Sequence, residues 1–306
     1  FPIPVKGEPG CPPVIRYPVP DLLDRIQRSP AFEDGIIILA FDELLQADAS
    51  TQKVLCSPLL DYSLGEHQLP NNVWILAASN RQSDGAGVNR ALSILTNRLC
   101  RYEVELPVED WLHYARDEGY HPMGLAFAER FPTHFATAVP PRDGAFCTFR
   151  SFSVMLDAIS AHNRVKGLDP HVVPDNVFLR NTVYGLIGDG VGMEFFQFAR
   201  VVDFLPSRQE ILETPHLAKL PGPGQVDAQY AASNMGISLA LEDPCNLNPC
   251  MKYIMRLPMI ELAVKAMVDL GSSVGGGVLM NNPEASAWLA KHKTLVCDAN
   301  AVRTSY

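Results

Sequence analysis

The chain has 306 residues, of which 47% are hydrophobic and 19% charged, a composition typical of folded proteins with one large or two ordinary domains. Its formal net charge of −9 argues against a nucleic-acid-binding surface, because such surfaces need clustered Lys and Arg. The sequence shows no run of about 20 apolar residues and no signal-peptide pattern at its start, so we expect a cytoplasmic protein without membrane contact.

The first strand is predicted to end in two carboxylates. Residues 1–35 are rich in proline and read as loop, apart from a short helix at Asp21–Gln27. The apolar run Ile36–Phe41 then predicts a strand buried on both faces, ending at Asp42-Glu43. Apolar residues at helical intervals predict a helix over Leu44–Tyr62, broken at Pro58.

A second strand is predicted over Val73–Ala78, and it ends in the polar group Ser79-Asn80-Arg81. A short helix is expected at Asn89–Arg98, and a third strand at Cys100–Leu106. Strands that alternate with helices indicate a parallel sheet covered on both faces, which binds ligands at the carboxyl ends of its strands. Both polar groups follow such ends.

Beyond Pro107 the pattern becomes helical. Glycines are expected to divide the long segment Asp175–Phe204 in two, and Gly271–Gly277 reads as a flexible loop because no Lys-Ser or Lys-Thr follows it. The predicted helices are Glu109–Glu118, Met123–Phe131, Phe149–Val165, Asp175–Phe204, Gln209–Leu212, Ala228–Leu241, Pro249–Leu270 and Pro283–Lys293.

The order of the polar residues suits hydrolysis of a nucleoside triphosphate. That reaction needs Mg²⁺, a group that orients the attacking water, and cations for the charge of the transition state. Asp42 would hold Mg²⁺ through water and Glu43 would polarise the attacking water, while Asn80 would bond that water or the γ-phosphate. Arg98 would reach a neighbouring subunit as a finger. Taken alone, Asp42-Glu43 fits the acidic start of an ordinary helix equally well.

The succession of these motifs resembles the AAA+ ATPases of the MoxR branch. It consists of IIILAFDELLQADASTQKVL, NNVWILAASN and ALSILTNRLCRYEVELPVEDWLHYA, read from the Walker B strand through sensor 1 to the arginine finger. Downstream, CTFRSFSVMLDAI resembles the sensor 2 helix and YGLIGDGVGMEFFQFARVVDFLPSRQEIL the later lid helices. The resemblance covers roughly residues 30–215 and is specific in the order and spacing of the motifs.

The resemblance assigns roles to individual residues. The matched positions are Asp42 and Glu43 for Walker B, Asn80 for sensor 1, Arg98 for the finger with Arg90 as runner-up, and Arg150 for sensor 2. It implies an AAA+-like parallel sheet that lacks its first strands (1–106), an α-helical lid (107–215) and a C-terminal helical extension (216–306). It also implies ATP and Mg²⁺ as cofactors, a homo-oligomeric ring of six subunits, and a remodelled protein partner, often one with a von Willebrand A domain.

The sequence departs from the family pattern before Ile36. No Gly-rich loop ending in Gly-Lys-Thr or Gly-Lys-Ser occurs there, and Lys6–Gly10 does not replace it, since Pro9 removes an amide donor that a phosphate nest needs. Either the chain begins inside a longer subunit, which we favour, or it is a degenerate member that binds nucleotide poorly or only in trans. The alternatives to a motor are a non-catalytic scaffold and another α/β enzyme that uses Asp42 and Glu43 as metal ligands.

Overall fold

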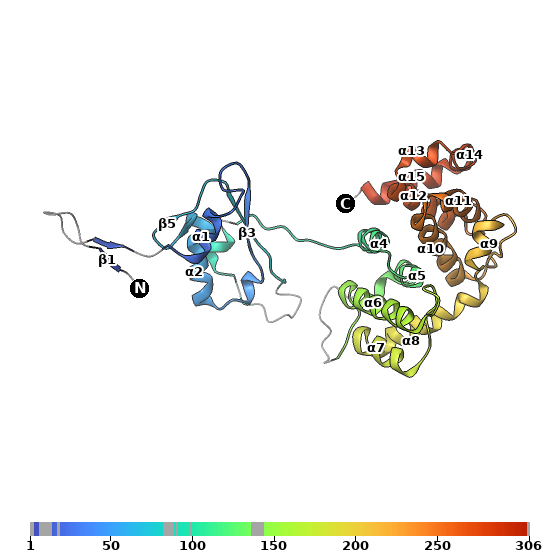
Figure 1. Ribbon diagram of the computed structural model, residues 1–306, viewed down its shortest axis with the longest axis horizontal. Helices are drawn as coiled ribbons and strands as arrows, with labels where there is room; N and C mark the ends of the chain where they lie inside the picture. Colours follow the sequence, from blue (N-terminus) through green and yellow to red (C-terminus); the bar gives the residue numbers. More distant parts are fainter. Residues whose placement is uncertain are drawn as a thin grey trace. The chain divides into compact units, whose positions relative to one another are not determined.

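The computed structural model describes residues 3–5, 14–16, 19–81, 89, 91–97, 99–135 and 144–304. The chain divides into two compact units, Phe1–Val104 and Glu105–Tyr306, which Figure 1 shows as a smaller unit with strands and a larger unit of helices. Helices make up 62% of the chain. The molecule is therefore mostly helical, with a small parallel sheet confined to the first unit.

The first unit contains six short strands, in three separate pairs, among its described residues. The predicted helix at Asp21–Gln27 is confirmed. The elements are β1 (Ile3–Val5), β2 (Val14–Arg16), α1 (Asp21–Gln27), β3 (Ile37–Phe41), η1 (Leu44–Gln46), α2 (Ala49–Asp61), β4 (Ser63–Leu64), β5 (His67–Gln68), β6 (Val73–Ala77) and α3 (Ser93–Thr96).

The central feature of this unit is the parallel pair β3 and β6. Ile37 lies opposite Val73, and the register continues without a bulge to Phe41 opposite Ala77. The pairing is anchored before the strands begin, because the Asn72 side-chain amide donates to three carbonyl oxygens between residues 31 and 35, at 2.9 to 3.1 Å. The residue that precedes the second strand therefore also fixes the start of the first.

The two faces of this sheet differ. Ile37 and Val73 pack with Leu23 and Ile26 of α1 in a small apolar core. The opposite face is exposed: Ile38 retains 63% and its register partner Trp74 retains 66% of their accessible surface. The prediction of strands buried on both faces is wrong for the described residues of this unit, because no helix among them covers the second face.

Three further expectations for this unit are corrected. Cys100–Leu106 forms no strand, and Tyr102 and Val104 within it are 81% and 87% exposed. Pro58 lies inside α2, and the helix continues past it to Asp61. The proline-rich start contains the antiparallel pair β1 and β2, whose strands are three residues long.

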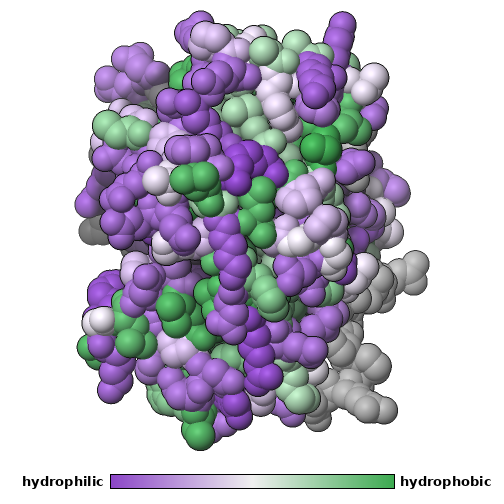
Figure 2. All heavy atoms as spheres, turned by 90° about the vertical axis from the view of Figure 1, so that its right-hand side faces the viewer, coloured by the Kyte–Doolittle hydropathy of each residue, from purple (hydrophilic) through white to green (hydrophobic). Residues whose placement is uncertain are grey.

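The second unit is helical throughout its described residues. Figure 2 views it from the right-hand side of Figure 1, with a mostly hydrophilic surface on which apolar side chains form small separate groups. Its elements are α4 (Val108–Asp117), α5 (Pro122–Arg130), η3 (Pro132–His134), α6 (Phe149–Lys166), α7 (Val177–Ile187), α8 (Asp189–Ala199), η4 (Arg200–Phe204), α9 (Arg208–Glu213), α10 (Val226–Glu242), η5 (Pro244–Asn246), α11 (Leu247–Ile254), α12 (Ile260–Val274), α13 (Gly276–Met280), α14 (Pro283–Lys291) and α15 (Lys293–Thr304).

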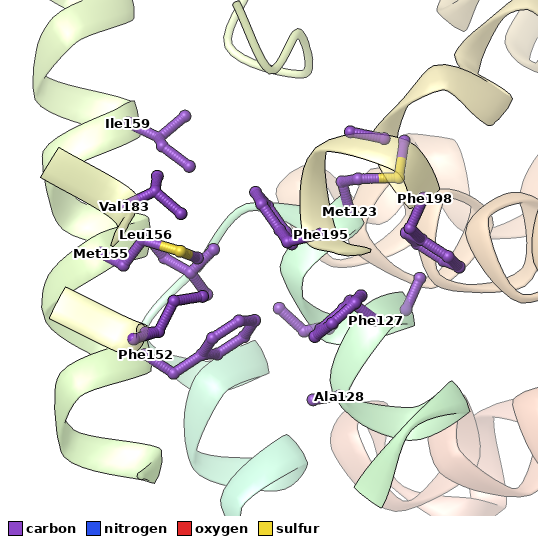
Figure 3. Close-up of a cluster of buried hydrophobic side chains, with 14 of the residues drawn as sticks. Met123, Phe127, Ala128, Phe152, Met155, Leu156, Ile159, Val183, Phe195 and Phe198 are labelled. Carbon is purple, nitrogen blue, oxygen red and sulfur yellow. The ribbon is translucent and has the colours of Figure 1, made fainter. Parts of the chain in front are cut away.

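An aromatic core holds α4 to α8 together (Figure 3). Phe127 of α5 is fully buried and meets Phe152 of α6 and Phe195 of α8, with ring centroids 5.8 and 5.4 Å apart. The helices approach closely at Gly124, where an added Cβ would lie 2.3 Å from a methyl group of Leu156. Burial of this size gives the unit most of its stability.

A second core joins α9 to α14, and α10 connects the two. The small residues of α10 allow close packing: Ala231 belongs to the first core, whereas Ala232 belongs to the second. The division into a lid (107–215) and an extension (216–306) stays a prediction, because both ranges lie in one compact unit.

Glycines have two effects on the predicted helices. Gly188, at a φ of 84°, ends α7 and begins α8, which confirms the expected division of Asp175–Phe204. The flexible loop expected at Gly271–Gly277 is wrong, because α12 runs to Val274 and α13 begins at Gly276. Only Gly275, at a φ of 92°, makes a turn there. None of the helices in the described part of the chain is long and apolar enough to cross a membrane.

Candidate functional site

The carboxyl ends of β3 and β6 lie side by side. The pairing continues beyond the strands, since the amide of Ala78 donates to the carbonyl oxygen of Phe41 at 2.8 Å and the amide of Leu44 donates to the carbonyl oxygen of Ala78 at 3.0 Å. The amide of Leu45 then donates to Oγ of Ser79 at 3.2 Å. Asp42 and Glu43 are therefore held at the same sheet edge as the segment that leads to Asn80.

Asp42 and Glu43 present their carboxylates to solvent. Both residues are exposed, and Oδ1 of Asp42 accepts the amide of Glu43 at 3.0 Å. Glu43 has a left-handed backbone with a φ of 56°, which few residues other than glycine adopt. This turn sends Leu44 into the core, where it is 6% exposed, while Glu43 stays outside.

Two amide side chains brace this edge, and sequence reasoning did not find them. Nδ2 of Asn89 donates to the carbonyl oxygens of Gln46 and Ala47, each at 3.2 Å. Gln52, which is fully buried, donates to the carbonyl oxygen of Ala47 at 3.0 Å and accepts the amide of Leu92 at 3.2 Å. The available signal was a polar Gln52 at helical spacing from apolar residues of α2, which indicates a satisfied buried amide.

The third acid of this segment has a structural role. Asp48 caps α2, and its Oδ1 accepts the amide of Thr51 at 2.7 Å and the hydroxyl of Ser50 at 2.8 Å. These hydrogen bonds, first that of the Thr51 amide, lower the pKa of Asp48. Asp48 is therefore engaged by its own helix, whereas Asp42 and Glu43 remain at the edge of the sheet.

The predicted arginines come later in the chain than this pair of strands. Arg98, and its runner-up Arg90, lie outside the described residues. Arg150 is exposed in the first turn of α6, which Thr148 caps by accepting the amide of Ser151 at 3.1 Å. It belongs to the second unit. The parallel pairing thus places Asp42, Glu43 and the segment that contains Asn80 at one sheet edge, and the arginine roles stay predictions.

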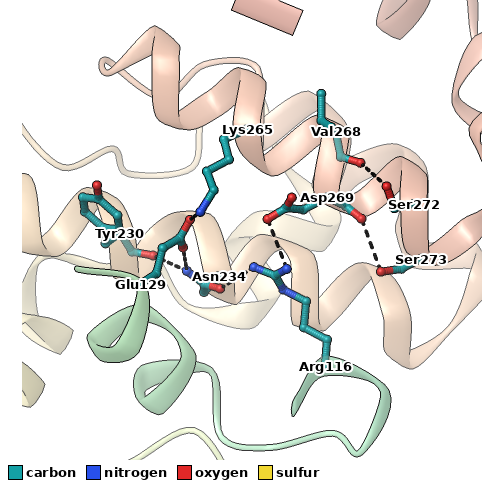
Figure 4. Close-up of polar contacts among 9 residues, drawn as sticks. All are labelled: Arg116, Glu129, Tyr230, Asn234, Lys265, Val268, Asp269, Ser272 and Ser273. Carbon is teal, nitrogen blue, oxygen red and sulfur yellow. Dashed lines mark hydrogen bonds and ion pairs between the residues drawn. The ribbon is translucent and has the colours of Figure 1, made fainter. Parts of the chain in front are cut away.

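A second polar cluster is buried in the helical unit (Figure 4). Arg116 of α4 forms an ion pair with Asp269 of α12 at 3.1 Å and donates to Oδ1 of Asn234 at 3.3 Å. Nδ2 of Asn234 donates to Glu129 of α5 at 2.7 Å, and Glu129 is paired with Lys265 of α12. The network balances two cations with two carboxylates and ties α4 and α5 to α10 and α12.

Burial sharpens the electrostatics of this network. Desolvation is the largest single influence on Glu129 and Lys265 and disfavours their charged forms. Their mutual attraction and hydrogen bonding, together with Arg116 beside Glu129 and Asp269 beside Lys265, outweigh it, so that the pKa of Glu129 is lowered and that of Lys265 is raised. A cavity of about 290 Å³ adjoins the network and is lined partly by Arg116, Lys265 and Asp269. Because every charge has a partner of opposite sign, we interpret the cluster as a structural network that holds the helices together.

A scan against protein-family models, a search of curated proteins and a search of solved structures found no match for this chain. Membership of the AAA+ family therefore stays a prediction from the order of the motifs. The fold itself supports the coarser description of a mostly helical chain with a small parallel sheet.

Proposed function

We propose that Asp42, Glu43 and Asn80 form the hydrolytic part of a nucleoside-triphosphate site in an AAA+ motor of the MoxR type. The observation that carries this proposal is the parallel, in-register pairing of β3 with β6, which ends the two strands at one edge. In open parallel sheets, ligands bind at the carboxyl ends of the strands. Had the two strands been separated, or had they run in opposite directions, the three side chains could not share a ligand.

Each side chain has one role in the proposed reaction. Glu43, exposed and turned outward by its backbone, accepts a proton from the attacking water. Asn80 donates a hydrogen bond to that water or to the γ-phosphate and so fixes the line of attack. Ser79 supports both, because its hydroxyl holds the chain after Glu43 against the end of β6.

The residues present fit Mg²⁺ bound mainly by water and phosphate. Within the described residues, no group of three or more His, Cys, Asp and Glu side chains could enclose a metal ion. Mg²⁺ keeps several waters and usually takes only one or two protein carboxylates together with substrate phosphates, and Asp42 would supply such a carboxylate. When bound, the ion would neutralise phosphate charge.

The remaining roles follow from the family resemblance. Arg98, with Arg90 as runner-up, would act on the site of a neighbouring subunit, and Arg150 would contact the γ-phosphate from the lid. Such roles require a homo-oligomeric ring, and six subunits are the expected number. The energy of ATP hydrolysis would serve to remodel or assemble a partner protein, with a von Willebrand A domain as the expected partner type.

The decisive experiment replaces Glu43 in the protein expressed from its complete coding sequence. Glu43→Gln keeps size and hydrogen bonding but removes the base, so we expect ATP turnover to fall by about a hundredfold or more while nucleotide binding persists. Phosphate release and equilibrium binding of a fluorescent ATP analogue measure the two quantities separately.

Glu66→Gln is the matched control, since Glu66 is an exposed acid of the same unit in the turn between β4 and β5. It should leave turnover unchanged. Unchanged turnover in Glu43→Gln would remove Glu43 from the mechanism. Binding without turnover in the unmodified protein would favour the scaffold alternative instead.

A further inference from the structure

The helical unit has a surface hollow between α7 and α8 that is lined by arginine, tyrosine and methionine side chains. Val177, Arg180 and Tyr184 follow one another at helical spacing on α7. Met193 lies on α8, and Arg200 follows the end of that helix as the first residue of η4. A cavity of about 320 Å³ lies between the α7 stripe and these two residues. Arg, Tyr and Met are among the residue types that protein interfaces favour over the rest of the surface.

The cavity is preformed by the packing of the two helices. Tyr184 lies against Gly192, where an added Cβ would come within 2.5 Å of the tyrosine ring. The same ring meets Phe196 edge-on, with centroids 6.2 Å apart. The aromatic walls are therefore held in place before any ligand arrives, which reduces the entropy cost of binding.

The charges of the hollow are not balanced among themselves. The Asp175 carboxylate accepts hydrogen bonds from Nε and Nη2 of Arg180, the latter at 2.8 Å. These hydrogen bonds contribute to the lowered pKa of Asp175. Arg200 lies farther from the same carboxylate, at 3.8 Å, and its side chain is 73% exposed. Two guanidinium groups thus share one carboxylate, leaving one positive charge on a chain whose net charge is −9.

Apolar side chains beside the hollow are also left in solvent. Met193 lines the cavity and is 56% exposed, and Val177 at the start of the α7 stripe is 73% exposed. A positive group next to exposed apolar surface matches a partner that offers a carboxylate beside an apolar side chain. The strongly acidic balance of the chain does not favour a second copy as that partner.

We propose that this α7–α8 hollow docks an extended segment of a protein partner in which acidic and apolar side chains alternate. A carboxylate of the segment pairs with Arg200, and a neighbouring apolar side chain enters the cavity between Tyr184 and Met193. Arg180, already held by Asp175, forms the fixed rim. The proposal concerns the helical unit alone and does not depend on nucleotide hydrolysis.

The test uses the whole protein and a short fluorescein-labelled peptide of alternating Glu and Leu, followed by fluorescence anisotropy. We expect saturable binding that weakens as salt is added, and at least about tenfold weaker binding to Arg200→Glu. Met193→Ser should weaken it by several fold. Lys291→Glu, an equal charge change on the distant helix α14 (Figure 1), should leave it unchanged.

Two comparison peptides and two further measurements can overturn the proposal. Equal binding of a peptide with Lys in place of Glu, or with Ala in place of Leu, would show that the assigned chemistry is wrong. Complete displacement by inorganic phosphate would reduce the site to an anion site. Sedimentation showing self-association that Arg200→Glu abolishes would assign the hollow to a second copy. Circular dichroism checks that each variant folds.

Discussion

The two units of this chain differ in how completely they bury their apolar side chains. In the helical unit, aromatic side chains such as Phe127 and Phe152 are fully buried, and its interior charges are paired. In the first unit the sheet buries one face, while Ile38 and Trp74 on the other are almost two-thirds exposed. Parallel sheets are normally covered on both faces.

This contrast shows where stability and function are expected to reside. The helical unit contains its own cores, so substitutions inside it should be costly. The sheet presents a polar edge with Asp42 and Glu43 and an apolar face that contributes little as it stands. Variants that probe burial should therefore have large effects in one unit and small effects in the other.

The largest effect is expected from breaking the buried network. Lys265→Met removes the ion-pair partner of Glu129, whose side chain is 5% exposed, and leaves that carboxylate with the Asn234 amide and the charge of Arg116 only. Loss of one member of a buried ion pair costs about 3–5 kcal/mol of unfolding free energy. Urea unfolding followed by far-ultraviolet circular dichroism reports on the helical unit, which dominates that signal.

Lys252→Met serves as the control, because Lys252 pairs with Glu284 at 3.3 Å near the surface, where the two side chains are 38% and 62% exposed. Its cost should lie between about 0 and 1 kcal/mol. A double variant, Lys265→Met with Glu129→Leu, should recover much of the loss. If Lys265→Met cost no more than the control, the network would not stabilise the helical unit.

An intermediate effect concerns pH. Burial, assisted by the nearby His171, lowers the pKa of His121 to about 4. The folded state thus holds this imidazole neutral, whereas the unfolded chain takes up a proton near pH 6.5. Protonation favours unfolding, so the full contribution is present above about pH 6.5 and is lost as the pH falls toward 4. As the pH falls from about 7 to about 5, this histidine should lower the free energy of unfolding by about 2 kcal/mol.

His121→Asn provides the matched variant, since His121 caps α5 by accepting the amide of Met123 at 3.2 Å and Asn can do the same. The smaller side chain changes the free energy of unfolding by the same amount at every pH. The test is therefore how steeply the free energy of unfolding of each protein changes with pH. The unmodified protein should lose about 2 kcal/mol more than the variant over this range. Equal slopes would mean that His121 is accessible to protons in the folded state.

Sequence reasoning succeeded where the signal was local. The helix at Asp21–Gln27 and the glycine break at Gly188 follow from residue type and spacing. The parallel pairing of the two strands followed from the rule that alternating strands and helices make parallel sheets. These predictions needed no knowledge of distant contacts.

It failed where the outcome depended on packing partners. The apolar content of Ile36–Phe41 predicted burial on both sides, but burial depends on what covers the strand. The glycines and serines of residues 271–277 suggested a loop, although helix α12 continues through Gly271 to Val274. Leu279 would lie 3.5 Å from a Cβ added at Gly271, a neighbour that the sequence alone does not show. The roles of Gln52 and Asn89 depend on carbonyl groups that the sequence alone cannot place.

The smallest effect is expected at the bare sheet face, and it tests the contrast most directly. Trp74→Ser removes a large apolar side chain that is 66% exposed, so the free energy of unfolding should change by no more than about 0.5 kcal/mol. Protection of the β3 and β6 amides against hydrogen exchange measures this change within the first unit. Loss of about 2 kcal/mol or more would show that another surface covers Trp74 in solution. Both units would then bury their apolar surface. The first unit would differ only in that a covering surface from elsewhere buries the second face of its sheet.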